Sequence, residues 1–105
     1  MVMPEADWKT LQEIKATALD RFCRRVLDEC RAVCDDDSAS AEERYRKLYD
    51  LIRKRDEELA DAFDDIRRST AIIRLATMHK HNLVTPEELA HFSNDTRHLL
   101  MHLDE

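Results

Sequence analysis

Apolar residues recur at helical spacing along most of the chain, and the first such stretch begins near residue 5. Pro4 suits the first position of a helix, and Glu5 and Asp7 are acidic residues of the kind that favours a helix N-terminus. The apolar stripe then runs through Trp8, Leu11, Ala18 or Leu19, Phe22, Val26, Cys30 and Val33. The pattern predicts a helix over residues 5–34, which ends at the polar run Asp35 to Ser38.

A second helical pattern begins after Ser40, because Ser40 and Glu43 have the spacing of a capping box. Apolar residues then stand seven positions apart, at Tyr45, Ile52, Leu59, Ile66 and Ile73. No glycine or proline interrupts this stretch, so we predict one helix over residues 41–81, about 60 Å long. Such a helix is longer than the diameter of a compact domain of this size. We therefore predict a homodimer, in which part of this helix contacts a second chain.

A third pattern follows Asn82, a residue that tolerates the left-handed conformation at the end of a helix. Thr85 and Pro86 are typical of a helix start, and they predict a helical head over residues 86–104 that Ser93 to Asp95 could divide. The predicted fold is all-α, a single domain over residues 1–105 with two long antiparallel helices and a small C-terminal head. We expect the dimer contact to involve the apolar residues of the second helix: Tyr45, Leu48, Ile52, Leu59 and Ile66.

Composition narrows the possible functions. The 105 residues include no glycine, which excludes the glycine-rich phosphate loops and dinucleotide-binding turns. The formal net charge of −6 disfavours a nucleic-acid-binding protein, and no apolar run approaches the length of a membrane span. Three cysteines are an odd number, and the first nine residues lack a signal-peptide pattern. We therefore expect a cytoplasmic protein with free thiols.

Two sets of residues have the spacing of metal ligands. Cys23, Cys30 and Cys34 share one helical stripe, which could bind a soft metal or simply be a row of small buried apolar residues. If the head is one helix, another stripe holds His91, Asp95, His98 and His102. That face could bind a divalent metal or be the solvated side of an amphipathic helix. We predict no resident metal and no cofactor, and we keep a metal-binding helical bundle as an alternative function.

The sequence has no recognisable catalytic motif, neither a nucleophile elbow nor a His-Glu-x-x-His zinc motif, and we predict that the protein is not an enzyme. Its densest polar and aromatic segment spans residues 46–55. Arginine and tyrosine are enriched where protein partners bind, although a solvated helix face has a similar composition. The candidate partner-binding residues in this segment are Arg46, Lys47, Tyr49, Asp50, Arg53 and Arg55.

The order of several residues is informative as well. The first helix contains Trp8, Glu13, Ala16-x-Ala18-Leu19 and Arg21, and the second contains Lys47-Leu48-Tyr49-Asp50 and Asp65-x-Arg67-x-Ser69, with Ile72 and Ala76 after it. Leu83, then Glu87 or Glu88, and Leu89 follow in the head. With one residue inserted between Asp50 and Asp65, this order resembles the fluorescence recovery protein family over nearly the whole chain.

Members of that family are small all-α homodimers of cyanobacteria and some other bacteria. They bind the photoactivated orange carotenoid protein, a carotenoid-binding protein, and speed its return to the resting form, which ends photoprotective quenching at the phycobilisome. In that family the functional surface centres on a tryptophan, a histidine, an aspartate and an arginine near the dimer contact. The resemblance places Asp50 at the aspartate, Arg46 at the tryptophan and Tyr49 at the histidine, and with a shift of one or two positions Lys54-Arg55 corresponds to a Lys-Arg pair of the family. A structural adaptor for an unrelated protein partner is the other alternative.

Overall fold

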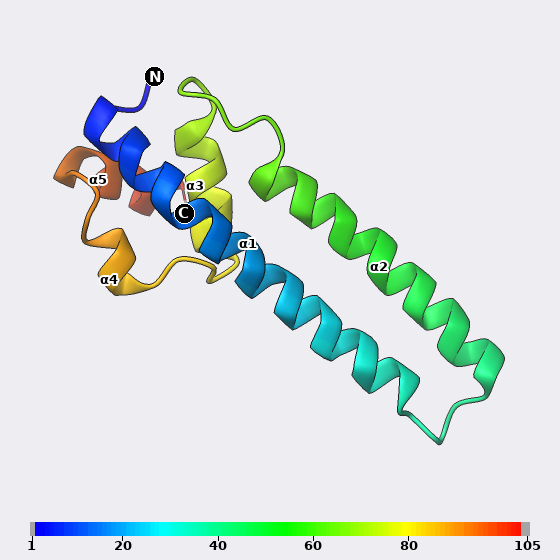
Figure 1. Cartoon of the computed structure of the whole chain (residues 1–105). Coiled ribbons are helices and arrows are strands. Elements are labelled where there is room, and N and C mark those ends of the chain that lie inside the picture. Colours follow the sequence, from blue (N-terminus) through cyan, green and yellow to red (C-terminus); the bar gives the residue numbers. More distant parts are fainter. Residues whose placement is uncertain (1, 104–105) are drawn as a thin grey trace.

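The computed structural model describes residues 2–103, and over this range it is helical with no strand. In chain order the helices are α1 (Glu5–Cys34), α2 (Ala41–Phe63), α3 (Ala71–Lys80), α4 (Pro86–Leu89) and α5 (Asn94–Leu103). Figure 1 shows α1 and α2 side by side as a long hairpin, with α3, α4 and α5 gathered at the end where the chain begins. The predicted all-α class is confirmed.

Charge and capping explain where the two long helices begin. Glu5 and Asp7 lie in the first turn of α1 and Arg31 in its last turn, so the charges complement the helix dipole at both ends. Ser40 caps α2, because its hydroxyl oxygen accepts a hydrogen bond from the backbone N–H of Glu43 at 3.1 Å. The polar connection over residues 35–40 turns the chain back, and α2 therefore lies along α1.

The continuous helix predicted over residues 41–81 is wrong beyond Phe63, where α2 ends. Asp65 has a φ of 54°, in the left-handed region that interrupts a right-handed helix. Thr70 Oγ1 accepts from the N–H of Arg67 at 2.9 Å and donates to the carbonyl of Asp65 at 2.6 Å. These bonds satisfy backbone groups locally, so the chain turns over residues 64–70 although it has no glycine there.

This turn lets α3 pack against α1, α2 and α5. Leu75 and Met78 of α3 are fully buried, and burying side chains of this size contributes about 1.5–3 kcal/mol each. The dimer was predicted because a helix over residues 41–81 would be longer than the domain, and the turn removes that reason. The 23 residues of α2 span about 35 Å, which is less than the 51 Å long axis of the molecule.

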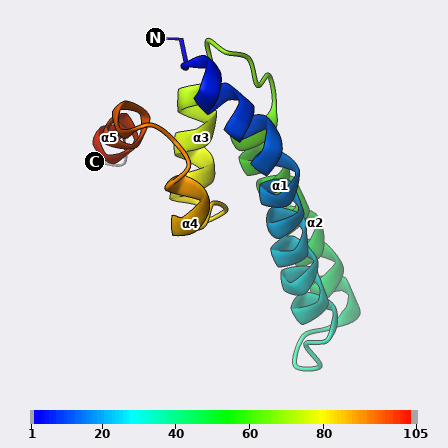
Figure 2. The same ribbon diagram turned by 60° about the vertical axis from the view of Figure 1, so that its left-hand side comes forward.

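Polar contacts fasten the head to α1, at its first turn and near its middle. Buried Asp7 accepts hydrogen bonds from the N–H and the hydroxyl of Ser93 and from the hydroxyl of Thr96. Arg21 donates to the carbonyl of Leu83 and to the carboxylate of Glu88, which completes the capping box of α4. Figure 2 shows α4 and α5 as two separate helices, and residues 90–93 connect them. Of the two, α5 packs against α3. Residue 104, where the head was predicted to end, lies outside the described residues.

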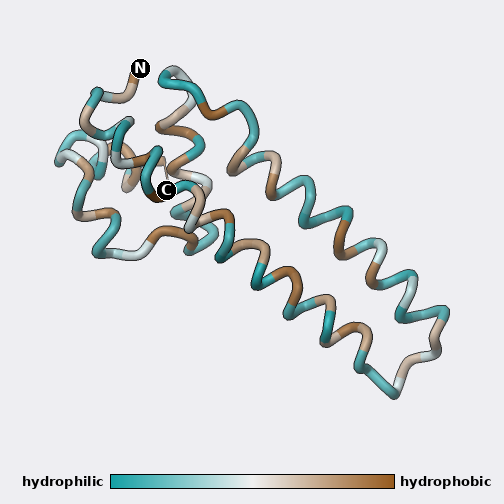
Figure 3. Tube along the Cα trace, in the orientation of Figure 1, coloured by the Kyte–Doolittle hydropathy of each residue, from teal (hydrophilic) through white to brown (hydrophobic). Residues whose placement is uncertain are grey.

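The buried core occupies only one end of this elongated molecule, which measures 51 × 25 × 23 Å. Its largest side chains come from α1, α3, α5 and the loop after α3: Leu11, Phe22, Leu75, Met78, Leu83, Phe92 and Leu100. Of residues 23–61, all of which the structure describes, only Ala39 is buried. Figure 3 shows apolar segments continuing along both arms of the hairpin beyond that core. We call residues 23–61 the outer hairpin, and its most exposed apolar and aromatic residues, Leu27, Tyr45, Tyr49 and Ile52, are 44–71% exposed.

Candidate functional site

Five of the six predicted partner-binding residues are exposed on α2, between its second turn and its middle: Arg46, Lys47, Tyr49, Asp50 and Arg53. Arg46 pairs with Glu42 at 3.0 Å, but both side chains are more than 70% exposed, so solvent screens this pair. Lys47 and Arg53 form no ion pair or hydrogen bond within residues 2–103. This part of α2 thus presents cationic and aromatic side chains to solvent, as protein-binding surfaces commonly do.

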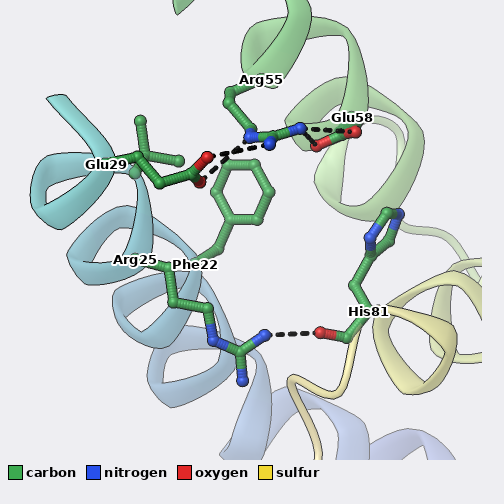
Figure 4. A pocket seen from close by; sticks show the side chains of 7 residues that line it. Phe22, Arg25, Glu29, Arg55, Glu58 and His81 are labelled. Carbon is green, nitrogen blue, oxygen red and sulfur yellow. Dashed lines mark hydrogen bonds and ion pairs between the residues drawn. The ribbon is translucent and has the colours of Figure 1, made fainter. Parts of the chain in front are cut away.

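Arg55, the sixth predicted residue, lies between the two arms of the hairpin. Its guanidinium donates to the carboxylate of Glu29 on α1 at 2.9 and 3.1 Å and to that of Glu58 on α2 at 2.9 Å (Figure 4). The bonds to Glu29 first, and then those to Glu58, raise the pKa of Arg55, while Arg55 lowers the pKa of Glu29. Arg55 therefore joins α1 to α2, and its charge is already paired within the chain.

A polar groove of about 210 Å³ surrounds this ion pair at the junction of the hairpin with the end of α3. Its lining comprises Phe22, Arg25, Val26, Glu29, Arg55, Glu58 and His81. Arg25 donates to the backbone carbonyl of His81 at 2.6 Å (Figure 4). It also donates to the carbonyl of Asn82 at 2.6 Å, so it holds the residues that follow α3. Arg25, Arg55 and both glutamates are thus engaged within the chain, where they hold α1 against α2 and against the end of α3.

A second groove between the two arms is almost entirely apolar, and we call it the apolar groove. It has a volume of about 210 Å³ and is lined by Phe22, Cys23, Val26, Leu27, Ile52, Arg55, Asp56 and Leu59. Leu27 is 53% exposed and Ile52 is 44% exposed, on α1 and α2 respectively. Nearer the start of α2, Tyr45 and Tyr49 are 71% and 62% exposed. Together with Arg46 and Asp50 they line a shallow depression on the surface.

The residues predicted to form a dimer contact separate into two groups. Tyr45 and Ile52 are exposed, and Leu48 and Leu59 are half-buried, all four on α2. Ile66 lies in the turn over residues 64–70 and packs against the core. Ile66 was grouped with the other four because of its seven-residue spacing, which places residues on one face only in a continuous helix. Since α2 ends at Phe63, the prediction that Ile66 shares their face is wrong.

The two candidate sets of metal ligands do not come together. Cys23 and Cys34 are exposed and Cys30 is half-buried, so the alternative of a buried apolar row of cysteines is wrong for two of the three. The break at residues 90–93 removes His91 from the stripe on α5, whereas His98 and His102 have their Nε2 atoms 3.0 Å apart. Within residues 2–103, no group of three or more histidine, cysteine or acidic side chains could hold a metal ion.

Several residues that line the two grooves were not predicted from the sequence. Leu27 and Asp56 of the apolar groove, and Glu29 and Arg25 of the polar groove, were not predicted. A signal for Leu27 was present, because Leu19, Cys23 and Leu27 are each four positions apart and widen the apolar side of α1 beyond a single stripe. Glu29 and Arg25 carried no such signal, since their partners are far away in the sequence.

Comparison with known proteins identified no relative of this chain. The sequence matches no protein-family model, no curated protein and no solved structure. Across the part of the chain that the structure describes, every helix is too short or too polar to cross a membrane.

Proposed function

We propose that this chain is a non-enzymatic regulatory protein of the fluorescence recovery protein type. It acts in the cytoplasm as a homodimer with two long antiparallel helices in each copy. It binds a photoactivated orange carotenoid protein, or a similar carotenoid-binding partner, and accelerates its return to the resting form. The observation that carries the proposal is the outer hairpin, where only Ala39 is buried among the fully described residues 23–61. An apolar helical face without a core of its own is a surface for protein partners.

The exposed part of α2 supplies chemistry for such a partner. Tyr49 offers an aromatic surface with a hydroxyl group, Asp50 an acceptor for charge-assisted hydrogen bonds, and Arg53 a cation free of ion pairs within residues 2–103. Arg55 acts indirectly, because it holds α1 and α2 together through Glu29. To speed relaxation, the chain has to bind the transition state or the resting-like form of its partner more tightly than the active form.

The test measures the recovery of photoactivated orange carotenoid protein in the dark, with and without the chain. We expect acceleration by the wild-type chain and at least about a fivefold smaller acceleration by Arg53→Glu, as for a residue that contributes to an interface. Lys9→Glu is the matched control, because Lys9 is also an exposed cation but lies on the first part of α1. No acceleration by a molar excess of folded wild-type chain rejects this function.

A further inference from the structure

Two histidine side chains meet on the exposed side of α5. The Nε2 atoms of His98 and His102 are 3.0 Å apart, and the two rings meet edge to face with centroids 4.5 Å apart. At 100° per residue, the two positions are about 40° apart around the helix, and both are about 120–160° from the buried residues Thr96 and Leu100. Two imidazole nitrogens therefore converge on one point at the surface, open to solvent.

We propose that His98 and His102 form a two-nitrogen binding site for a divalent transition-metal ion of the nickel or copper type. Histidines at i and i+4 lie one turn apart on one face of a helix, which is a spacing that lets two imidazoles bind a single ion. Imidazole nitrogen is a ligand that suits both nickel and copper. Because both side chains are exposed, water fills the other positions around the ion, and the site is one for an exchangeable ion rather than a resident one.

The distance between the two Nε2 atoms favours one coordination geometry. At a metal–nitrogen distance of about 2.0–2.1 Å, two nitrogens 3.0 Å apart form an angle of about 90–97° at the ion. Ligands at about 90° are neighbours in the square-planar geometry typical of copper and nickel. The tetrahedral geometry of zinc needs nitrogens about 3.3–3.4 Å apart, so zinc would have to move the rings.

The hydrogen bond between the rings can be exchanged for the ion without a change in protonation. In a pair of neutral rings, one Nε2 carries the hydrogen and donates it to the other. Metal binding needs a lone pair on both Nε2 atoms, and the donor ring supplies it when its hydrogen moves from Nε2 to Nδ1. Two metal–nitrogen bonds then replace one hydrogen bond, and the neutral pair neither gains nor loses a proton.

The charges on α5 permit a cation beside the two histidines. Asp95 is about 60° from His98 around the helix, so a negative charge lies on the same side. Arg97 is the only lysine or arginine of α5, and it donates to the side chain of Asn94 at the start of the helix. The guanidinium is thus held towards the other end of α5 from His102.

An ion at this site would also stabilise the last turns of α5. The helix has ten residues, a length at which isolated helices are marginal in water. Both imidazoles reach one ion in this geometry only while residues 98–102 are helical, so the ion binds the folded helix more tightly than the unfolded chain. Because α5 packs against α3, the ion should stabilise the head as well.

Calorimetric titration of the untagged full chain with nickel chloride tests the site. Three cysteines are first replaced by serine so that thiols do not compete: Cys23, Cys30 and Cys34. We expect one ion per chain, and at least about tenfold weaker binding for His98→Gln or His102→Gln, because one ligand alone gives no chelate. The double variant should bind no more weakly than either single one. His91→Gln is the matched control, since His91 is exposed but lies outside the pair.

A rearranged variant separates the spacing of the histidines from their number. His102→Leu combined with Leu103→His keeps the composition, exchanges two exposed side chains and places the second histidine about 140° from His98. Once circular dichroism shows that this variant is folded, we expect its nickel affinity to match that of His98→Gln. Unchanged affinity in either variant contradicts the proposal, as does the absence of one-to-one binding at about 1 mM nickel. Zinc binding as tight as nickel binding contradicts the 90° geometry.

Thermal denaturation gives a second readout. Saturating nickel should raise the melting temperature of the cysteine-free chain by at least about 4 °C and leave that of its His98→Gln variant unchanged. Equal shifts for the two chains would contradict a site at this pair. The inference does not rest on the proposed function, and no carotenoid protein takes part in either experiment.

Discussion

Asp7 is the buried carboxylate that joins the first turn of α1 to the start of α5, and we predict that Asp7→Asn strongly destabilises the protein at neutral pH. The carboxylate accepts from the Ser93 N–H at 2.8 Å, the Ser93 hydroxyl at 2.7 Å and the Thr96 hydroxyl at 2.6 Å. Hydrogen bonds to charged groups contribute about 1.5–3 kcal/mol each, but three bonds to one carboxylate are not additive.

The exposure of Ser93 and the burial of Thr96 indicate how much of the stabilisation by the Asp7 hydrogen bonds the variant loses. Thr96 is fully buried, so its hydroxyl loses a charged acceptor in a place that water does not reach. Ser93 is exposed and can bond to water in the variant, which recovers part of the loss. We therefore expect Asp7→Asn to lower the free energy of unfolding by about 2–4 kcal/mol.

The effect should depend on pH. Burial is the largest influence on the pKa of Asp7 and raises it, but the hydrogen bonds from Thr96 and Ser93 together bring it below the usual value of 3.8. A carboxyl group whose pKa is lower in the folded state stabilises the protein above its unfolded pKa. This contribution disappears as the pH falls through the folded pKa. The difference between wild type and Asp7→Asn should therefore be complete at pH 7 and shrink below about pH 4.

Urea unfolding followed by circular dichroism measures this difference, at pH 7 and at pH 3. The protein concentration must be the same throughout, because association contributes to apparent stability. Asp37→Asn serves as the matched control, since Asp37 is an exposed carboxylate in the turn between α1 and α2. A free energy of unfolding of Asp7→Asn within about 0.5 kcal/mol of wild type at pH 7 would contradict this role of Asp7. The same difference at both pH values would contradict it as well.

Two further substitutions test the hairpin and the turn after it. Arg55→Met should lower the free energy of unfolding by about 1–2 kcal/mol, allowing for solvent screening at Glu29, whose side chain is 41% exposed. Thermal denaturation checks this, with exposed Arg53→Met as the control, and equal melting temperatures for the two variants would contradict it. Asp65→Val should cost about 1–2 kcal/mol because of the positive φ, whereas Asp65→Gly should cost nothing. A larger loss for glycine than for valine in urea unfolding would instead indicate a continuous helix.

The parts of the fold that were predictable are those with local causes. Acidic residues in the first turn and an unbroken apolar period mark α1, and Ser40 marks the start of α2. The turn over residues 64–70 has a local cause as well, in Asp65 and Thr70, but these residue types also occur within helices. What decides between a turn and a continuous helix is the burial of α3 against α1, α2 and α5, and a seven-residue apolar row does not reveal that packing.

The candidate site also has a part that the sequence indicates and a part that depends on how the helices pack. The exposure of Tyr49 and Arg53 agrees with a polar and aromatic segment on one side of α2, which a residue pattern can indicate. The pairing of Arg55 with Glu29 depends on how α1 and α2 align in space, across 26 positions of sequence. The spacing of residues 46–55 does separate the two arginines, because Arg55 stands seven positions after the half-buried Leu48 whereas Arg53 lies on another side of α2. Nothing in this segment identifies Glu29 as the partner of Arg55.

The exposed apolar residues of the outer hairpin need a second protein surface to cover them, and we propose that a second copy of the chain supplies it. Sedimentation equilibrium of the wild-type chain at micromolar concentration tests this most directly, with Ile52→Asp as the variant that places a charge among these residues. We predict twice the chain mass of 12.4 kDa for wild type and a shift towards the single-chain mass for the variant. A wild-type chain that sediments as a folded monomer at tens of micromolar would contradict the account.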